Sequence, residues 1–398
     1  MKMRIGRTKV LFFENDVVYK VYYGGYGRWT SQMLFENYSR ILDWVKGLDG
    51  FEQLIEASYP VLKVKYAGEL VKDDNISSVI SPGPQITQIL ETLESLNIKH
   101  RDVIPGNLLV KDSKLTLVDY EYSFFPGCIF IDEEEAPYGL AGPFKSEKGF
   151  DDSFSFHEIW RGFGRELVLK KDITKKISLI ASEGYKDGSS VWQGVTFHPI
   201  PFDDFSSVRS HKKIPCHAEY TAIKNFIEEK KIEKDSVLDL GSNVGFFSFS
   251  FNRDFDSTVL GIEKDAFNEQ VARLLALFYE KRRVTFEIGD ALEYVLATDK
   301  VFDIVLCLNT HMWMYKQHTA EKTMQMMKKL AKMTRHLFFQ TAHAESASMY
   351  TVNELKNKEE LINYLKEAGF ENIEPIFESN LHDRKLRILF YAEGDKRN

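Results

Sequence analysis

The chain has 398 residues, a formal net charge of −7 and a pI near 5.9. This length predicts two or three domains, because a single hydrophobic core rarely extends beyond about 250–300 residues. The acidic balance argues against duplex nucleic acid as the main partner, since such proteins need a positive field that neutralises phosphates. The 3 Cys residues form no CxxC motif and no cluster with His, so neither a disulfide framework nor structural zinc is expected.

The amino-terminal sequence lacks the long apolar stretch of a signal peptide. No apolar run approaches the roughly 18 residues that are needed to span a bilayer. We therefore expect a cytoplasmic protein without a transmembrane segment.

The first 165 residues combine short β-rich runs with two helical segments. Residues 8–23 form two β-rich runs divided by Asn15-Asp16, which predicts a hairpin. Residues 31–48 and 84–97 carry apolar side chains at helical spacing. Two short strands, YPVLKVKY and GELV, are expected between these helices. The sequence LLVKDSKLTLVDYEYS after the second helix predicts another hairpin.

From about residue 216 helices alternate with strands, ending in the strand LRILFYAEG. This alternation predicts a parallel sheet covered by helices on both faces. The region between the two patterns is irregular or mixed. We therefore predict an N-terminal domain over residues 1–165, a linker over residues 166–215 and an α/β domain over residues 216–398.

The sequence VLDLGSNVGFF places Asp239, Gly241, Asn243 and Gly245 between a buried strand and a helix. Ligands of open α/β sheets bind at the carboxyl ends of the strands. The backbone of such a turn must approach the ligand closely, which favours Gly and residues that tolerate left-handed backbone, such as Asn. The next strand ends in Glu263, where a carboxylate can accept hydrogen bonds from both ribose hydroxyls.

The third strand of this region ends at Asp290 and Ala291, and the fourth ends in CLNTHMW, which contains Asn309 and His311. The spacing does not fit the G-x-G-x-x-G fingerprint of dinucleotide-binding proteins. The ordered set resembles the class I S-adenosylmethionine-dependent methyltransferases, whose fold is a Rossmann-like, seven-stranded sheet. The residues that the resemblance implies for cofactor binding are Asp239, Gly241, Asn243 and Gly245 at the methionine moiety, Glu263 at the ribose, Asp290 and Ala291 at the adenine, and Asn309 beneath the cofactor.

Residues 100–107, HRDVIPGN, have the spacing of a phosphoryl-transfer catalytic loop. Protein kinases combine an H-R-D-x-x-x-x-N loop with a strand lysine, a helix glutamate and a metal-binding aspartate. In this chain Lys20 lies in a predicted strand, and the next helix carries Glu36 as its expected ion-pair partner. Asp119 follows the second predicted hairpin at the place of the metal-binding aspartate.

The set resembles a minimal two-lobed member of the kinase-like superfamily, similar to small bacterial kinases that act on sugars and lipopolysaccharide. The resemblance implies that Lys20 holds the phosphates of ATP, that Asn107 and Asp119 bind Mg²⁺, and that Asp102 accepts the proton of the acceptor hydroxyl. Two features depart from the pattern. Glu121 stands where the D-F-G motif has Gly, and no Gly-rich loop precedes Lys20.

The tandem resembles the bifunctional kinase–methyltransferases that cap bacterial O-antigen polysaccharides with a methyl phosphate, with the order of the two domains inverted. Residues 190–211 are similar to the segment that precedes the methyltransferase domain in polysaccharide methyltransferases. The basic residues at its end, Arg209 and His211 followed by two lysines, are candidates for binding a substrate phosphate. A solvated basic face is the alternative reading of the lysines.

Two positions for the methyl group stay open. A phosphomonoester is largely dianionic at pH 7 and needs no strong base, whereas a hydroxyl acceptor needs one, for which His311 is the candidate.

Two other functions also stay open. One is an O-methyltransferase for a glycan or small molecule with a non-catalytic kinase-like module. The other is modification of an RNA end, for which a local basic patch such as the run at 281–283 is the signal.

Overall fold

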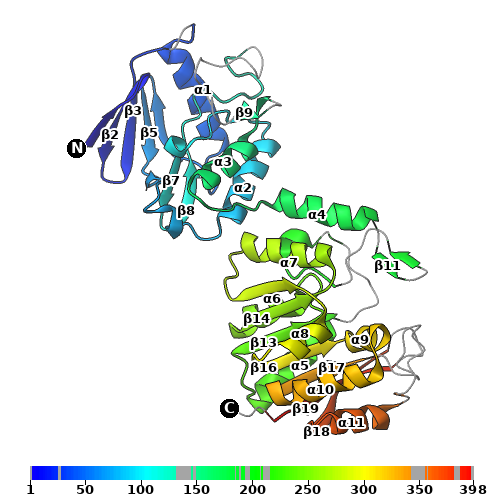
Figure 1. Cartoon of the computed structure of the whole chain (residues 1–398). Coiled ribbons are helices and arrows are strands. Elements are labelled where there is room, and N and C mark those ends of the chain that lie inside the picture. The colour runs from blue at the N-terminus through cyan, green and yellow to red at the C-terminus, as the bar shows by residue number, and fades with distance from the viewer. Residues whose placement is uncertain are drawn as a thin grey trace. The chain divides into compact units, whose positions relative to one another are not determined.

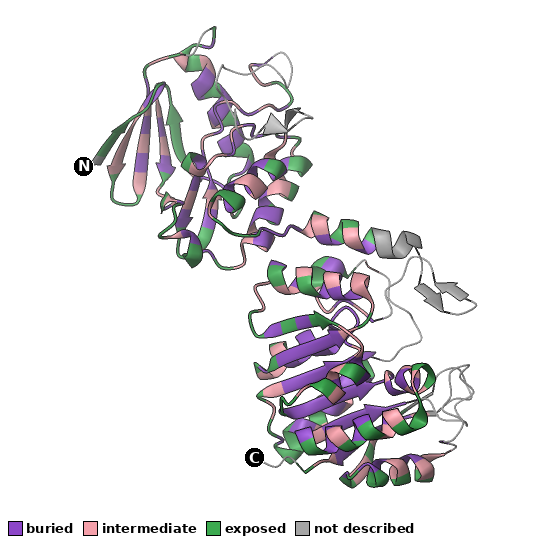
Figure 2. Ribbon diagram, viewed as in Figure 1, coloured by how far each residue is buried: buried purple, intermediate pink, exposed green. Residues whose placement is uncertain are grey.

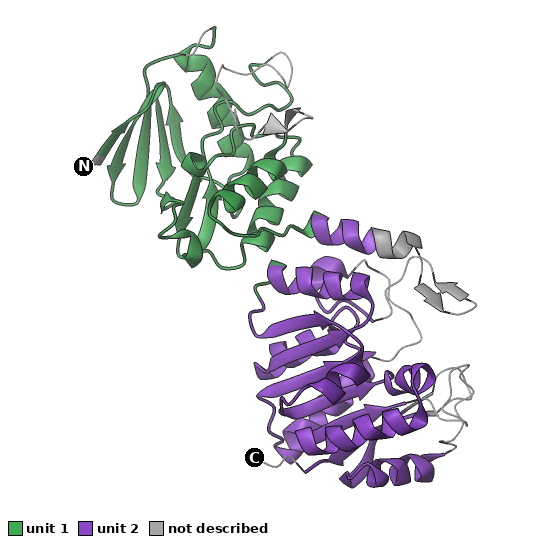
Figure 3. Cartoon of the chain, viewed as in Figure 1, with its two compact units in different colours: residues 1–171, 278–280 green, residues 172–277, 281–398 purple. Residues whose placement is uncertain are grey.

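In a computed structural model the protein is described over residues 2–25, 28–130, 145–146, 149–183, 185–187, 190–192, 198–206, 208, 216–341, 355, 357–380 and 386–395. Its contacts divide the chain into two compact units (Figure 3). The first comprises residues 1–171 and 278–280, and the second comprises residues 172–277 and 281–398. Each unit has its own hydrophobic core. Within these described ranges, no helix has the length and apolar character needed to cross a bilayer.

An antiparallel five-stranded sheet forms one part of the first unit, in the order β1-β2-β3-β5-β4 (Figure 1). The strands are β1 Lys2–Ile5, β2 Lys9–Glu14, β3 Val17–Tyr22, β4 Leu54–Ser58 and β5 Val61–Lys65. The predicted hairpin is formed by β2 and β3, and Asn15 at its turn has a left-handed backbone with φ 52°. Helix α1, Ser31–Trp44, begins at Thr30, whose side chain accepts a hydrogen bond from the Met33 amide. The strands β1 and β4 have no counterpart in the sequence prediction.

The rest of the first unit is built around a small sheet and two helices. The elements are β6 Glu69–Leu70, η1 Ile76–Ser78, α2 Pro82–Ser95, η2 Pro105–Asn107, β7 Leu108–Lys111, β8 Lys114–Leu117, β9 Lys145–Ser146, β10 Gly149–Phe150 and α3 Asp152–Gly162. The strands β7 and β8 form the second predicted hairpin. The loop 100–107 therefore runs from the end of α2 into β7.

A seven-stranded sheet forms the centre of the second unit, in the order β15-β14-β13-β16-β17-β19-β18. Its strands are β13 Ser236–Leu240, β14 Thr258–Glu263, β15 Val284–Ile288, β16 Phe302–Leu308, β17 Thr334–Gln340, β18 Glu371–Asn380 and β19 Leu386–Glu393. The first five in spatial order are parallel, and β19 pairs antiparallel with both β17 and β18. The predicted Rossmann-like sheet is thus confirmed, with an antiparallel edge.

Helices accompany this sheet, whose central strands are buried along their length (Figure 2). They are α5 Cys216–Lys230, α6 Phe246–Phe255, α7 Ala266–Phe278, α8 Ala291–Ala297, α9 His311–Gln317, α10 Ala320–Met333 and α11 Lys358–Glu367. Between the two predicted domains lie α4 Lys170–Glu183, β11 Tyr185–Asp187, β12 Ser190–Trp192 and η4 Asp203–Phe205. Because five strands run in parallel, their carboxyl ends meet at one edge, where a ligand site is expected.

Candidate functional site

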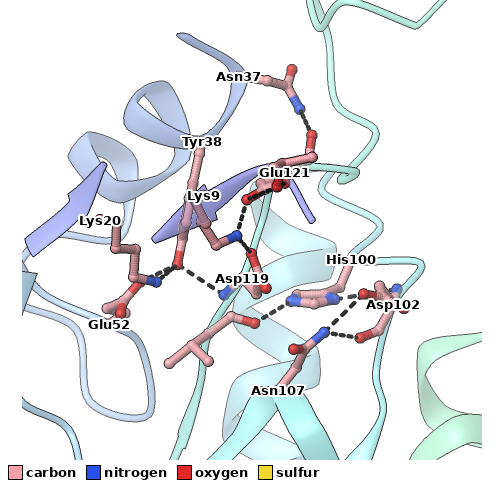
Figure 4. Close-up of polar contacts among 12 residues, drawn as sticks. Lys9, Lys20, Asn37, Tyr38, Glu52, His100, Asp102, Asn107, Asp119 and Glu121 are labelled. Carbon is pink, nitrogen blue, oxygen red and sulfur yellow. Dashed lines mark hydrogen bonds and ion pairs between the residues drawn. The ribbon is translucent and has the colours of Figure 1, made fainter. Parts of the chain in front are cut away.

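Lys20 is a buried cation on β3, and its partner is Glu52 (Figure 4). The Lys20 Nζ donates to Glu52 Oε2 at 2.8 Å and to the Tyr38 hydroxyl at 2.6 Å. The Tyr38 hydroxyl in turn donates to Glu52. A lysine held in a buried network of this kind keeps a fixed position, as a phosphate-binding lysine requires.

The prediction that Glu36 pairs with Lys20 is wrong. The inward face of α1 carries its apolar side chains and Tyr38, so helical phase turns Glu36 to the exposed face. There its carboxylate accepts a hydrogen bond from Gln32 Nε2 at 3.0 Å. The carboxylate that Lys20 uses is instead that of Glu52, two residues before β4.

Lys9 on β2 is a second buried cation, which sequence reasoning missed. Its Nζ lies 2.5 Å from Asp119 Oδ1 and forms an ion pair with Glu121 as well. The Thr8 hydroxyl also donates to Glu121 Oε2, at 3.1 Å. Glu121 is only 1% exposed, so its charge needs a cation beside it. Where the D-F-G pattern has Gly, this chain therefore has a buried glutamate, Glu121, whose charge Lys9 compensates.

The charges in this cluster shift one another's titration. Burial lowers the pKa of Lys9, and the charge of Asp119 offsets this only in part. Burial alone would raise the pKa of Asp119, but the charges of Lys9 and Lys20 outweigh it and lower that pKa. Asp119 is therefore an anion at neutral pH. Its backbone is left-handed, with φ 74°, and its amide donates to the Tyr38 hydroxyl at 2.8 Å.

The loop 100–107 is held by buried side chains and by α3. The backbone amides of His100 and Arg101 donate to the two carboxylate oxygens of Asp152, at 2.7 and 2.9 Å. The buried ring of His100 hydrogen-bonds to the carbonyl oxygen of Val118 at 3.1 Å, which ties the loop to the residue before Asp119. Asp152 gave no signal in the sequence, because it lies about 50 residues beyond the loop that it fixes.

Asp102 and Asn107 lie together, as their spacing predicts. The Asn107 Nδ2 donates to Asp102 Oδ2 at 2.9 Å and to the Asp102 carbonyl oxygen at 2.8 Å. This leaves the Asn107 Oδ1 as the atom that could face a cation. Figure 4 shows Asp102, Asn107 and Asp119 in one region of the first unit. Carboxylate and amide oxygens suit Mg²⁺, so the residues fit such an ion.

The turn after β13 has the conformation that its sequence predicts. Gly241, Asn243 and Gly245 all have left-handed backbone, with φ of 77°, 52° and 86°. A Cβ atom at Gly241 would come within 2.2 Å of the Thr310 hydroxyl oxygen, so only Gly fits there. Asp239 is 2% exposed and accepts a hydrogen bond from Ser248 Oγ at 2.6 Å. Burial raises the pKa of Asp239 to about 7.

The carboxylates of the next two strand ends are held by backbone amides. Glu263 accepts from the amides of Asn243 and Asp265, both at 2.8 Å, and so links the turn after β13 to the end of β14. Asp290 caps α8 by accepting from the Leu292 amide at 3.0 Å, and Ala291 is the first residue of that helix. These acidic side chains lie at consecutive strand ends, as a nucleoside site requires.

Asn309 and His311 follow β16, but their environments differ. The Asn309 Nδ2 donates to Gln340 Oε1 at 2.5 Å, and Arg387 donates to Asn309 Oδ1 at 2.7 Å. The His311 ring is fully buried and hydrogen-bonds to the Tyr364 hydroxyl at 2.8 Å. Burial lowers the pKa of His311 to about 3, so this ring is a poor proton acceptor at neutral pH.

The two predicted phosphate-binding residues, Arg209 and His211, lie outside the described residues. The lysines that follow them lie outside as well. Besides Lys9, Glu52 and Asp152, the structure adds Glu219, Gln340 and Arg387 to the polar residues near the predicted sites.

Residues 231–383 match a family model described as a methyltransferase domain. Apart from residues 278–280, the matched residues belong to the second unit. No curated protein matches the sequence.

Three solved structures illustrate the structural similarity. A crystal structure of WbdD has a TM-score of 0.42 and 21% identity, and the match covers 50% of this chain and 44% of that chain. A structure described as the bifunctional kinase-methyltransferase WbdD has a TM-score of 0.42 and 21% identity, covering 51% and 43% of the two chains. The N-terminal domain of EvdMO1 with SAH bound has a TM-score of 0.37 and 18% identity, covering 56% and 97%. The match thus spans less than half of the length of the WbdD chains.

Replacing Lys9 by Met should destabilise the first unit by about 3–5 kcal/mol, because the buried charge of Glu121 loses its partner. The double variant Lys9→Met/Glu121→Gln should lose less than the sum of the single changes. Urea unfolding of the four proteins measures this coupling. Lys111→Met is the matched control, since its exposed pair with Asp16 should contribute less than about 1 kcal/mol. Additive losses would show that Lys9 and Glu121 do not interact.

The raised pKa of Asp239 predicts a pH-dependent stability of the unliganded second unit. The folded protein binds the Asp239 proton up to about pH 7, whereas the unfolded chain releases it near pH 4, so unfolding free energy falls as pH rises between these values. Asp239→Asn has no proton to release, so its unfolding free energy should not fall in this way. Relative to the wild type, the variant should stabilise the unit more at pH 8 than at pH 5, by a few kcal/mol in order of magnitude. Calorimetry at both pH values checks the difference, with the exposed Asp299→Asn as control. An equal effect at both pH values would contradict the assignment.

Proposed function

We propose that the chain phosphorylates a hydroxyl of a sugar or glycan with Mg-ATP and then methylates the new phosphate with S-adenosylmethionine. The observation that carries the first step is the cluster of Lys9, Lys20 and Asp119 in the same unit as the linked pair Asp102 and Asn107. The second step rests on the methyltransferase domain and on the carboxylates at its strand ends.

Phosphoryl transfer needs positioning and charge stabilisation more than covalent chemistry from the protein. In the proposal, Lys20 contacts the phosphates of ATP, and Glu52 and Tyr38 keep its ammonium in place. The Asn107 Oδ1 and a carboxylate oxygen of Asp119 would hold Mg²⁺. Asp102 accepts the proton of the acceptor hydroxyl as that oxygen forms its bond to the γ-phosphorus. The bond to the β-phosphate oxygen breaks, and ADP leaves.

In the second step S-adenosylmethionine supplies an electrophilic methyl group. The turn at Gly241, Asn243 and Gly245 would pass close to its methionine moiety, and Glu263 would accept from its ribose hydroxyls. A phosphate oxygen forms the new bond to carbon as the bond from carbon to sulfur breaks, and the electron pair of that bond stays on sulfur. The protein has to align the two groups at contact distance and exclude water.

The environment of His311 supports phosphate rather than hydroxyl as the methyl acceptor. A hydroxyl must lose its proton during transfer, and a base with a pKa of about 3 takes it poorly at neutral pH. The second ionisation of a phosphomonoester has a pKa near 6, so this group is already an anionic nucleophile. Methylation of a phosphate therefore needs no proton transfer to His311, whose ring then has a packing role only.

A second candidate is an O-methyltransferase whose first unit binds the acceptor without transferring phosphate. The ion pair of Lys9 with Asp119 favours it, because Lys9 lies against Asp119 Oδ1, one of the two oxygens through which this carboxylate could bind a metal. The two candidates differ in their need for ATP.

The ordered reaction is tested by incubating the chain with a panel of sugars and short glycans, ATP, Mg²⁺ and S-adenosylmethionine, followed by mass spectrometry of the sugars. We expect a gain of phosphate plus methyl, and no methyl gain when ATP is omitted. Asp119→Asn should lose both gains, because it weakens the metal site. Asp239→Ala should keep the phosphate gain and lose the methyl gain.

The exposed Asp299→Asn variant controls for a general effect of removing a carboxylate. A methyl gain without ATP would refute the coupled reaction and favour the second candidate. Phosphate gain by the Asp119→Asn variant at the normal rate would refute the assignment of the metal site.

A further inference from the structure

A second polar cluster lies at the edge of the sheet where the cofactor residues lie. It consists of Glu219 on α5, Asn309 after β16, Gln340 at the end of β17 and Arg387 near the start of β19. Because β19 is antiparallel to β17 and Gln340 pairs with Leu389, the start of β19 lies beside the carboxyl end of β17. Arg387 therefore reaches the edge at which the parallel strands end.

Apart from Asn309, itself a predicted cofactor residue, the strand residues of this cluster lie beyond the strands that carry the predicted cofactor residues. Asp239 and Glu263 lie near the carboxyl ends of β13 and β14, and Asp290 follows β15, on one side of the sheet order. The strand residues of the cluster belong to β16, β17 and β19, on the other side: Asn309 follows β16, Gln340 ends β17, and Arg387 lies near the start of β19. The Asn309 side chain stands at the boundary, directly after the strand that neighbours β13. A methyl acceptor must lie next to the cofactor. This half of the edge is the half that Asp239, Glu263 and Asp290 do not occupy.

Hydrogen bonding within the cluster is incomplete. Arg387 donates to Asn309 Oδ1 at 2.7 Å, and Asn309 donates to Gln340 Oε1 at 2.5 Å. Gln340 and Glu219 also interact, but the buried atoms Gln340 Nε2 and Glu219 Oε1 make no well-aligned hydrogen bond within the described residues. Buried polar atoms in proteins are nearly always well paired, so a buried donor and acceptor that pair this poorly can rearrange to hydrogen-bond a ligand.

The charge of Arg387 is also incompletely compensated. In the described part of the chain, no carboxylate lies within 4.0 Å of its guanidinium. Burial lowers the pKa of Arg387, and the more distant charge of Glu219 offsets this only in part. A partly buried guanidinium without an ion-pair partner among the described residues costs free energy, which a bound anion would recover.

We propose that Glu219, Asn309, Gln340 and Arg387 form the acceptor site of the methyltransferase unit, and that Arg387 binds an oxygen of a phosphomonoester there. The proposal rests on the proposed function, to which it adds the residues that recognise the acceptor. The planar guanidinium of Arg presents several donors and suits phosphate, which it can bind through two parallel hydrogen bonds. Asn309 holds the guanidinium, so the cation is oriented before the acceptor arrives.

Glu219 is the acidic member of the cluster, and its charge opposes an anion. Burial raises the pKa of Glu219, although Gln340 and Arg387 act in the other direction. The raised pKa favours the neutral carboxyl, which can donate a hydrogen bond to a phosphate oxygen. The Gln340 Nε2, which pairs poorly with Glu219, can donate in the same way. The two groups thus complete a set of donors around the guanidinium.

The test uses the full chain saturated with S-adenosylhomocysteine, with inorganic phosphate as the probe and calorimetry as the readout. We expect the wild type to bind phosphate and Arg387→Gln to bind it at least ~10-fold more weakly, as expected for the loss of a charged hydrogen bond. Arg387→Lys should retain part of the affinity, because it keeps the charge. Glu219→Gln should bind phosphate as tightly as the wild type or more tightly.

The matched control is Arg335→Gln on β17, whose guanidinium pairs with Glu233 and lies at the opposite end of that strand. It should leave phosphate binding unchanged. Each variant must bind S-adenosylhomocysteine within about two-fold of the wild type, which shows that the unit is folded.

Three results would overturn the acceptor site. They are no phosphate binding by the wild type, equal binding by Arg387→Gln, or loss of methyl transfer in Glu219→Gln but not in Arg387→Gln. The last result would identify a neutral hydroxyl acceptor with Glu219 as its base. Failure of the wild type to bind S-adenosylhomocysteine would instead contradict the proposed function itself.

Discussion

The need to compensate buried charge is the constraint on which the first unit depends. Lys9 and Lys20 are both buried, on neighbouring strands of an antiparallel sheet. Such ammonium groups persist only beside carboxylates, and Glu52, Asp119 and Glu121 supply them. The same pairs fix the position of Asp119 relative to the sheet. A network built for charge balance therefore also places the residues that would hold a nucleotide and its metal.

In the second unit the direction of the strands has the equivalent role. Five parallel strands bring their carboxyl ends to one edge, so residues far apart in the sequence meet there. Asp239 is ionisable yet almost fully buried at that edge, and its raised pKa shows that the unliganded site is not optimised for stability. Burial likewise disfavours the charged forms of Arg387 and Glu219, because it lowers the pKa of Arg387 and raises the pKa of Glu219. Residues that cost stability in this way are typical of sites that bind a charged ligand.

Much of this could be predicted from the sequence, because the relevant signals are local. The strand–turn–helix pattern at Asp239 to Gly245 and the spacing of Asp102 and Asn107 each lie within a few residues. Contacts between distant segments could not be predicted in the same way. Glu36 has the sequence position of a partner for Lys20, but helical phase turns it outward, and Glu52 takes that place from a segment with no motif. Lys9, Asp152 and Arg387 were missed for the same reason, since each acts on a residue at least 50 positions away.

The central claim is that the methyl group is transferred to a phosphate that the same chain has attached. Phosphorus NMR of the purified product tests it most directly, because a methyl ester of the phosphate couples the phosphorus to the methyl protons. We predict a phosphodiester signal split by three equivalent protons, whose chemical shift does not change between pH 5 and 8, since the group with a pKa near 6 is lost. A phosphorus signal that titrates near pH 6 and lacks this coupling, in a product that carries the methyl group, would contradict the claim.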